Sequence, residues 1–335
     1  MMDLPYAHGG PPLRGRMRVI ADDFEVDEVL GFEPDGQGEH SYLRIEKRDA
    51  NTEWVAQQLA SFAGVAPMAV SYSGLKDRHA LTRQTLSVQL PGRPEPDWDA
   101  LRVEGVKVLS AVRHSRKLKR GTHKSNLFRI RLRELQGSRD EAEARIGQLG
   151  RLGVPNYFGE QRFGRNNENL HAARALFGGR RMSRSQRGFA LSAARSWLFN
   201  AVLGRRVAAG NWNRALDGEV WMLAGTHSIF GPQPLDEALE HRLAAFDIDP
   251  TGPLWGRGEL RSGGRVAAIE HEVAQNHPDL ADGLAAADLA HERRSLRLRP
   301  LPFHHRWEPP DALVLEFALP SGAFATAVLR ELCTW

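Results

Sequence analysis

The sequence predicts an α+β fold in which one domain is interrupted by another. The chain has 335 residues, enough for two domains that each bury a core. Apolar and polar residues alternate as in strands over the first part of the chain and again from Arg297, whereas helical spacing dominates from Asn167 to Gly210. We therefore expect the two ends to share a mixed, largely antiparallel sheet with flanking helices, and the middle to form an inserted domain.

The first part of the chain predicts short strands around one helix. Thr52 is expected to be the N-cap of a helix that runs through Ala63 and ends at Gly64. The residues up to Leu13 are rich in Gly and Pro, so a poorly ordered start is expected. Strands are expected at residues 17–30, 41–47, 70–72, 85–90, 106–113 and 126–132.

Helices prevail in the middle, and a strand and a helix close the chain. Helical spacing predicts helices at 139–152, 189–209, 266–276 and 280–294, while residues 211–264 mix short strands and turns. Leu313, Leu315 and Phe317 mark a late strand through Leu319. Ser321 is then expected to be the N-cap of a helix through about residue 332.

Composition favours a protein of the cytoplasm with a mild positive charge. The net charge of +4 and the pI of about 9.4 suit a polyanionic partner without requiring one. Cys333 is the only cysteine of the sequence, so neither an intramolecular disulfide nor a cysteine metal cluster is possible. The start of the chain does not resemble a signal peptide, and no apolar run predicts a membrane span.

Several well-known catalytic signatures are absent. The pair His271-Glu272 is followed by a histidine only at 277, too late for the H-E-x-x-H zinc motif. Residues 256–258 lack the third glycine of a dinucleotide fingerprint, and neither a Walker motif nor a G-x-S-x-G elbow occurs. Metal, nucleotide and serine-hydrolase sites are therefore not predicted.

One carboxylate, Asp77, stands in a compact run of charge behind the strand expected at 70–72. A charged loop is most often solvated, but an Asp just after a strand is also where α+β enzymes keep catalytic groups. Ionisation of such a carboxylate in a closed pocket needs a nearby cation. Its neighbours Lys76 and Arg78 would point to the opposite side in an extended segment, so we expect a basic residue from elsewhere to face it.

A basic stretch covers residues 113–124 and has two interpretations. It is either a solvated hairpin whose charged edges resist aggregation, or an arm that contacts phosphates. The stretch contains no acidic residue. Its basic residues are Arg113, Arg116, Lys117, Lys119, Arg120 and Lys124.

Five stretches resemble, in the same order, motifs of the pseudouridine synthase D (TruD) family. Residues 71–80 carry the pattern G-x-K-D-[KR]-x-A, whose Asp is Asp77. The others are DDFEVDE at 22–28, HKSNLF at 123–128, VPNYFGEQRFG at 154–164 and LPSGAFATAVLREL at 319–332. The resemblance spans nearly the whole chain, and the combination of motifs is very specific.

The resemblance implies a fold and a reaction. The fold would be a pseudouridine synthase catalytic domain, residues 1–151 and 299–335, with an inserted α+β TRUD domain at 152–298. The reaction would be the isomerisation of uridine 13 of tRNA, notably glutamate tRNA, to pseudouridine, with Asp77 as the nucleophile. Neither a cofactor nor a metal is implied, and tRNA is the one partner expected of a monomer.

The resemblance also implies residues that contact the target base. These are Phe24, Asn126 and Phe324, while Arg18 is a supporting candidate because the family carries a basic residue at this distance before Phe24. Lys76 is a further supporting candidate. From local pattern alone, each Phe would be a core residue and the Asn a turn residue. An enzyme that extracts uracil from its stack must replace that stacking, which aromatic rings can do.

Some alternatives stay open at this point. The aromatics of residues 154–164 are expected to be structural, whereas Arg162 could bind RNA or join the domains. The carboxylate of Asp77 could attack the ribose or the base. The same reaction on another RNA, or a non-catalytic RNA-binding protein of the same fold, are the rival functions.

Overall fold

The computed structural model describes residues 3–335 and divides into two compact units. The sheet unit comprises Pro12–Ala142, Pro300–Gly322 and Cys333–Trp335. The helical unit comprises the described residues up to Pro11, Glu143–Arg299 and Ala323–Leu332. These units are defined by packing alone, so the TRUD domain boundaries at 152 and 298 stay a prediction.

The sheet unit is built on a mixed, largely antiparallel sheet, and with the helices this confirms the predicted α+β class. The strand order is β14-β15-β7-β2-β5-β3-β6. Two pairings, β2 with β5 and β1 with β16, are parallel. The strands are β1 (Leu13–Met17), β2 (Phe24–Val29), β3 (His40–Arg48), β4 (Val70–Tyr72), β5 (Leu81–Gln89), β6 (Val106–His114), β7 (Ser125–Gly137), β14 (Phe303–Glu308), β15 (Ala312–Pro320) and β16 (Cys333–Thr334).

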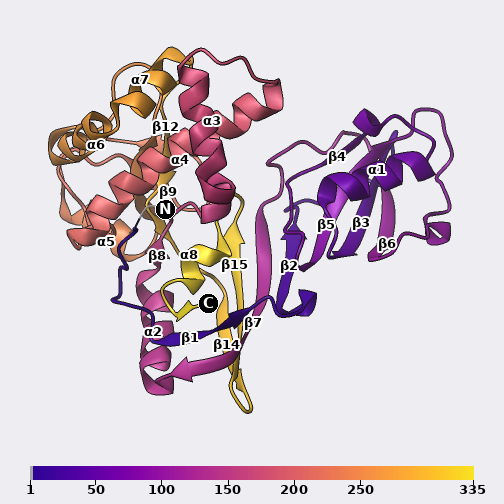
Figure 1. Cartoon of the computed structure of the whole chain (residues 1–335), viewed down its shortest axis with the longest axis horizontal. Coiled ribbons are helices and arrows are strands. Elements are labelled where there is room, and N and C mark those ends of the chain that lie inside the picture. Colours follow the sequence, from indigo (N-terminus) through magenta and orange to yellow (C-terminus); the bar gives the residue numbers. More distant parts are fainter. Residues whose placement is uncertain (1–2) are drawn as a thin grey trace. The chain divides into compact units, whose positions relative to one another are not determined.

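The late strand β15 joins the first part of the chain, as the pattern predicted. It pairs along its length with β7, from Leu313 opposite Leu132 to Pro320 opposite Ser125. Helix α1 (Thr52–Phe62) lies across strands of this unit (Figure 1) and buries Val55 and Leu59 against apolar side chains of β3 and β5. Burial of these side chains drives the association of helix and sheet.

Helix α1 begins one residue earlier than expected, because its N-cap is Asn51 and not Thr52. Thr52 is the first helical residue, and its hydroxyl makes tertiary contacts. It donates to Oε1 of Gln84 at 2.9 Å and accepts the backbone N–H of Lys76 at 3.1 Å. These long-range partners, which local pattern cannot show, fix the threonine inside the helix.

The helical unit packs its helices around α4, which Figure 1 shows among α3, α6 and α7. Ser183 caps α4 reciprocally, since its hydroxyl accepts the N–H of Gln186 and the Gln186 side chain accepts the N–H of Ser183. The helices are α2 (Arg139–Leu152), α3 (Glu168–Phe177), α4 (Arg184–Ala208), α5 (Glu237–Ala244), α6 (Gly264–Asn276), α7 (Pro278–Ala286) and α8 (Ala325–Leu329), and the division between the units falls within α2.

A small four-stranded sheet, in the order β10-β9-β11-β12, completes this unit with a two-stranded pair. Its last strand corrects the helix expected at 280–294, because the helix ends at Ala286 and β12 follows. The strand β12 pairs with β11, and its Arg293 donates to the buried carboxylate of Glu270 at 2.8 Å. The strands are β8 (Val154–Pro155), β9 (Trp221–Leu223), β10 (Ile229–Phe230), β11 (Ile248–Leu254), β12 (Glu292–Ser295) and β13 (Arg297–Leu298).

Two expectations about segments near the chain ends, both in the helical unit, were wrong. The last helix, α8, begins only at Ala325 with Phe324 in the N-cap position, so Ser321 is not its cap. The early residues expected to be poorly ordered are held: the backbone N–H groups of Ala7 and His8 donate to the Glu331 carboxylate at 3.1 and 3.3 Å. A buried carboxylate needs such donors, which explains why this segment is fixed.

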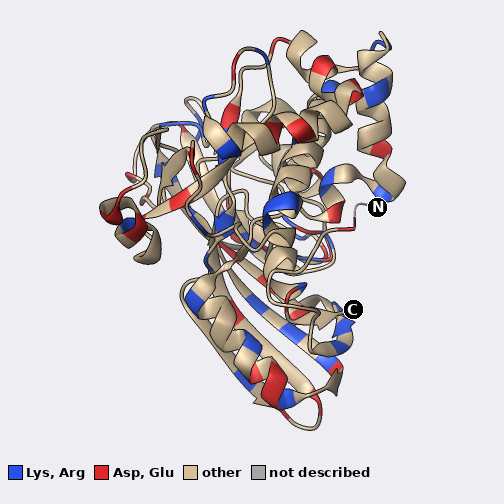
Figure 2. Ribbon diagram, turned by 90° about the vertical axis from the view of Figure 1, so that its left-hand side faces the viewer, with Lys and Arg blue, Asp and Glu red and all other residues tan. Residues whose placement is uncertain are grey.

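Charged residues are dispersed over the chain. Figure 2 shows basic and acidic positions interspersed along helices and strands, in keeping with 45 Lys and Arg against 41 Asp and Glu. Within residues 3–335, none of the helices combines the length and apolarity needed to span a bilayer.

Candidate functional site

Asp77 lies in the loop between β4 and β5, and hydrogen bonds to neighbouring elements hold the backbone of this loop. The ammonium of Lys47 on β3 donates to the carbonyl of Asp77 at 2.8 Å. Next to it, the backbone N–H of Lys76 donates to the Thr52 hydroxyl of α1 at 3.1 Å. The loop is therefore tied to a strand and a helix at adjacent residues, which fixes where the Asp77 side chain begins.

The carboxylate of Asp77 faces Arg18, the basic residue expected from elsewhere in the chain. Nη2 of Arg18 lies 3.2 Å from Oδ2 of Asp77, and the two side chains are 26% and 31% exposed. The guanidinium also lies over the Phe24 ring, with Cζ 4.0 Å from its centroid. Arg18 thus connects Asp77 with Phe24, although its role in a reaction stays a prediction.

Arg18 holds this position at a conformational cost. Its φ of +59° lies in the left-handed region, which a residue with a long side chain seldom adopts. Its Nε is buried and has no hydrogen-bond partner within residues 3–335. Strained backbone and unsatisfied polar atoms persist where the surrounding structure fixes them, and they cluster at functional sites.

Lys47 is a site residue that the sequence reasoning missed. It is 1% exposed, and burial lowers the pKa of its ammonium to about 8, against the opposing attraction of Asp77 and with a further lowering by Lys76. A signal was present in the sequence: Lys47 has the same parity in its strand as Leu43 and Ile45, so it lies on the core face. A buried lysine needs a hydrogen-bond acceptor, and the acceptor of Lys47 is the backbone carbonyl of Asp77.

Lys76 does not face Asp77, as expected for a sequence neighbour. Its Nζ lies 2.5 Å from Oε2 of Glu28 on β2, and the two side chains are buried. The other oxygen of Glu28 accepts the backbone N–H of Thr85 at 3.1 Å. Lys76 is therefore engaged in an internal ion pair that joins the loop to β2 and β5.

Phe24 is a core residue in this structure. It is 1% exposed, begins β2, and meets the Phe128 ring edge to face at 6.2 Å. A base could contact Phe24 only after the side chains around it move, so its role in substrate binding stays a prediction.

Asn126, near the start of β7, presents a buried acceptor without a donor. It is 8% exposed, and its Oδ1 has no hydrogen-bond partner in the part of the chain that the structure describes. Its Nδ2 lies 3.4 Å from Nε2 of His123, whose Nδ1 bonds the hydroxyl of Ser73. Burial, and then the charge of Lys76, lower the pKa of His123, so the ring is neutral at pH 7. The N3–H of uracil is a donor of the kind that Oδ1 lacks.

Phe324 belongs to the helical unit, unlike the other expected base contacts. Its ring meets Phe158 edge to face at 5.9 Å, and the guanidinium of Arg162 lies 5.5 Å from its centroid. Tyr157, Phe158 and Phe163 are buried in one apolar cluster, as expected for the aromatics of this motif. A meeting of Phe324 with Asp77 stays a prediction.

The basic stretch 113–124 is divided between internal contacts and free charges. Arg113 pairs with Glu95 at 2.5 Å, and Arg120 donates to the hydroxyl of Tyr72 at 3.1 Å. No acidic side chain among residues 3–335 pairs with the remaining charges on Arg116, Lys117, Lys119 and Lys124. The ammonium of Lys117 donates to the carbonyl of Met68 at 3.1 Å, and the four charges without an acidic partner are the ones available to phosphates.

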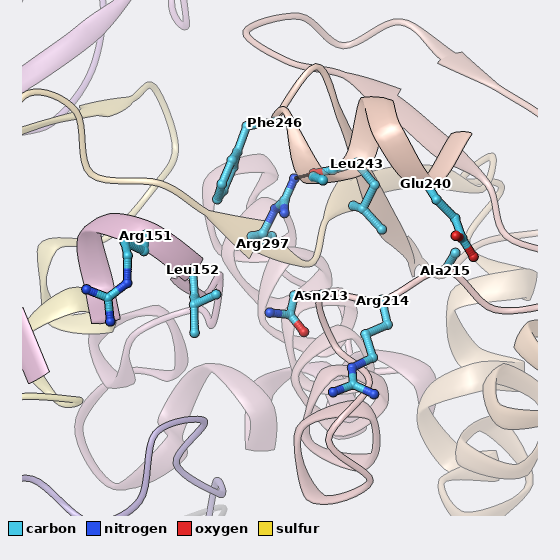
Figure 3. A pocket seen from close by; sticks show the side chains of 10 residues that line it. Arg151, Leu152, Asn213, Arg214, Ala215, Glu240, Leu243, Phe246 and Arg297 are labelled. Carbon is cyan, nitrogen blue, oxygen red and sulfur yellow. Dashed lines mark hydrogen bonds between the residues drawn. The ribbon is translucent and has the colours of Figure 1, made fainter. Parts of the chain in front are cut away.

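A cavity of about 490 Å³ lies elsewhere, in the helical unit. Its lining includes Arg151, Arg214, Phe246 and Arg297 (Figure 3). The charge of Arg297 is balanced by Asp249, whose Oδ1 is 2.6 Å from Nε. Since the lining contains none of the residues expected to contact substrate, the cavity is not part of the candidate site.

Comparisons with known proteins match one family over nearly the whole chain. The sequence profile of the family described as tRNA pseudouridine synthase D (TruD) matches residues 3–180 and 179–332. The tRNA pseudouridine synthase D of Xanthomonas axonopodis pv. citri is 51% identical and that of Methylococcus capsulatus 48%, each covering 98% of this chain and 94% of the relative. A crystal structure from Methanosarcina mazei that carries the same family name shares the fold, with a TM-score of 0.73 at 22% identity over 98% of both chains.

The chain therefore belongs to the tRNA pseudouridine synthase D (TruD) family. Pseudouridine synthases are isomerases, which makes this protein an enzyme of that class.

Proposed function

We propose that this enzyme converts uridine 13 of tRNA, notably glutamate tRNA, to pseudouridine, with Asp77 as the nucleophile. The observation that carries the proposal is the ion pair between Asp77 and Arg18, set in the family motif and in a loop that Lys47 anchors. A carboxylate held by a charge-assisted contact is oriented for attack.

The reaction needs one well-placed carboxylate. The bond from N1 of uracil to the ribose breaks, the base turns, and a bond from C5 to the same ribose carbon forms. C5 loses a proton and N1 gains one, so the product is an isomer and no electron is lost. Asp77 can attack the ribose carbon or the base, and it can assist the proton transfer at C5.

Three residues are proposed to contact a flipped uracil. The unpartnered Oδ1 of Asn126 can accept the N3–H of the base, and aromatic rings can replace the stacking lost in the tRNA. Phe24 and Phe324 are proposed for stacking. Lys76 supports the site indirectly, because its pair with Glu28 fixes the loop.

Transfer RNA is the proposed partner, and the cytoplasm, where tRNA is modified, is the proposed location. The protein is proposed to act as a monomer without a protein partner. Pseudouridine formation on another RNA is the second candidate function. The intact Asp77 motif and its ion pair argue against a protein that only binds RNA.

Pseudouridine mapping of total RNA tests the proposal. The RNA would come from a bacterial strain that lacks the activity, with and without this protein, and a third culture would express Asp77→Asn. We expect pseudouridine at position 13 of glutamate tRNA only with the parent protein. A new pseudouridine only in another RNA would replace the substrate assignment, and none at all would refute the proposed reaction.

A further inference from the structure

Two guanidiniums of the helical unit share one aromatic ring and lack a counter-ion. Arg162 lies in the 3-10 turn Glu160–Phe163 and Arg294 in β12, and their Cζ atoms are 5.4 and 4.2 Å from the centroid of the Phe158 ring. Their side chains donate to neutral groups: Arg162 to the Ser192 hydroxyl at 3.1 Å and Arg294 to Oδ1 of Asn156 at 2.6 Å. Within residues 3–335, no carboxylate forms an ion pair with either arginine.

The fully buried arginines of the same unit differ from these two because they have acidic partners. Each has a carboxylate at ion-pair distance: Arg206 with Glu219 at 2.9 Å, Arg293 with Glu270 at 2.8 Å and Arg297 with Asp249 at 2.6 Å. Pairing is the usual condition for burying a charge. Arg162 and Arg294 are partly buried and lack such a partner, and both guanidiniums lie near the ring of Phe158.

The two charges disfavour each other. Burial, and then the charge of Arg162, lower the pKa of Arg294 to about 9, and burial lowers the pKa of Arg162 as well. An arginine keeps its proton at pH 7 all the same, so the site carries two positive charges that are partly removed from water. An anion bound to both would relieve this repulsion.

Unsatisfied polar atoms mark the same place. Nε of Arg162, Nε of Arg294 and the hydroxyl oxygen of Thr326 are buried without a hydrogen-bond partner in the described chain. Gly159 makes the close approach possible, since a Cβ there would lie 2.9 Å from the Thr326 oxygen and 3.5 Å from a ring carbon of Phe324. The Phe324 ring meets Phe158 edge to face at 5.9 Å, so the two arginines and Phe324 have the Phe158 ring as a common neighbour.

We propose that Arg162 and Arg294 form a binding site for a phosphodiester group of the RNA backbone, beside the nucleotide that contacts Phe324. The inference rests on the proposed function, which supplies the RNA and the role of Phe324. A guanidinium binds phosphate through two parallel N–H donors, and its flat face stays free to lie on an aromatic ring. Both guanidiniums lie near the Phe158 ring, and the Nε–H of each lacks an acceptor among the described residues, so donors remain for a phosphate.

The test compares RNA binding by Arg162→Gln, Arg294→Gln and the parent over about 50 to 300 mM KCl. The RNA is glutamate tRNA with cytidine at position 13, so that binding is measured without turnover. Each variant should bind about tenfold more weakly and lower the slope of log K against log salt by about 0.7 to 0.9, the value for one phosphate contact. Arg174→Gln is the matched control, because Arg174 of the same unit is exposed and already pairs with Asp279.

A second measurement protects the test against variants that fold poorly. Inorganic phosphate at about 50 mM should raise the melting temperature of the parent and of Arg174→Gln, but raise it less in either site variant. Parent affinity and salt slope in folded Arg162→Gln and Arg294→Gln would overturn the proposal, as would an equal phosphate effect in all four proteins. If the site variants lower the salt slope as expected but the parent protein forms no pseudouridine, the proposed reaction is refuted and the phosphate site is still supported.

Discussion

Replacement of Lys47 by methionine removes a buried ammonium while it keeps an apolar chain of similar length. The pKa of Lys47 falls from 10.5 to about 8 in the folded protein, a difference of 2.5 units. At 1.36 kcal/mol per unit, the charged form is disfavoured by about 3 kcal/mol in its buried place. The buried ammonium donates a hydrogen bond to the Asp77 carbonyl, so the free-energy cost of burying this charge falls at the candidate site.

The sign of the pH dependence follows from the direction of this shift. Between about pH 8 and 10.5 the unfolded chain binds a proton at Lys47 that the folded protein has released. The free energy of unfolding of the parent should therefore rise with pH in this window relative to Lys47→Met, by about 1.4 kcal/mol at pH 9 and about 3 kcal/mol in full. Below pH 8 the difference between the two proteins should be constant.

Urea denaturation of both proteins at about pH 7 and pH 9 measures this difference. Single-turnover conversion of tRNA should be about tenfold slower in Lys47→Met, because the Asp77 backbone loses its anchor. The parent should also lose activity above about pH 8, when Lys47 becomes neutral, and the variant should not. A stability difference that is equal at both pH values would refute the argument.

Three further changes test other parts of the account. Arg18→Met removes the cation beside Asp77, and single-turnover conversion should slow by about ten- to a hundredfold at unchanged tRNA affinity; an equal loss of affinity would instead assign Arg18 to RNA binding. Glu28→Gln leaves the buried Lys76 without its anion, and chemical denaturation should show a loss of about 3 to 5 kcal/mol; a loss well below this range would show that the pair contributes little. Neutral substitutions of the unpaired charges in 113–124 should weaken tRNA binding and flatten its salt dependence, and unchanged binding would indicate a solvated surface.

The spacing of apolar residues in the sequence predicted the strands and helices that depend on that spacing alone. The alternation of β15 and the helical spacing of α4 are properties of neighbouring residues, and both elements lie where the pattern indicated. The expectation that Lys76 would turn away from Asp77 also follows from the two-residue repeat of an extended segment. The contact between Arg18 and Asp77 was expected from motif spacing, and the structure shows it at 3.2 Å.

The remaining features depend on partners far away in the sequence. Thr52 was expected to cap a helix, and it lies inside the helix because Gln84 and Lys76 occupy its hydroxyl. Residues 292–294 were expected to be helical, and they form a strand that pairs with β11, from which Arg293 reaches Glu270. The sequence could not predict that Arg162 lacks an acidic partner, because this depends on which carboxylates the fold places near it.

The central claim is that Asp77 is the nucleophile, and single-turnover conversion of glutamate tRNA by Asp77→Asn tests it most directly. The variant keeps the shape and the hydrogen-bonding capacity of the side chain but loses its charge and nucleophilicity. The account predicts that pseudouridine formation is abolished, while the melting curve and the tRNA affinity stay close to those of the parent. Phe24→Ala, measured in parallel, should retain some activity. Conversion by Asp77→Asn at near the parent rate would contradict the claim.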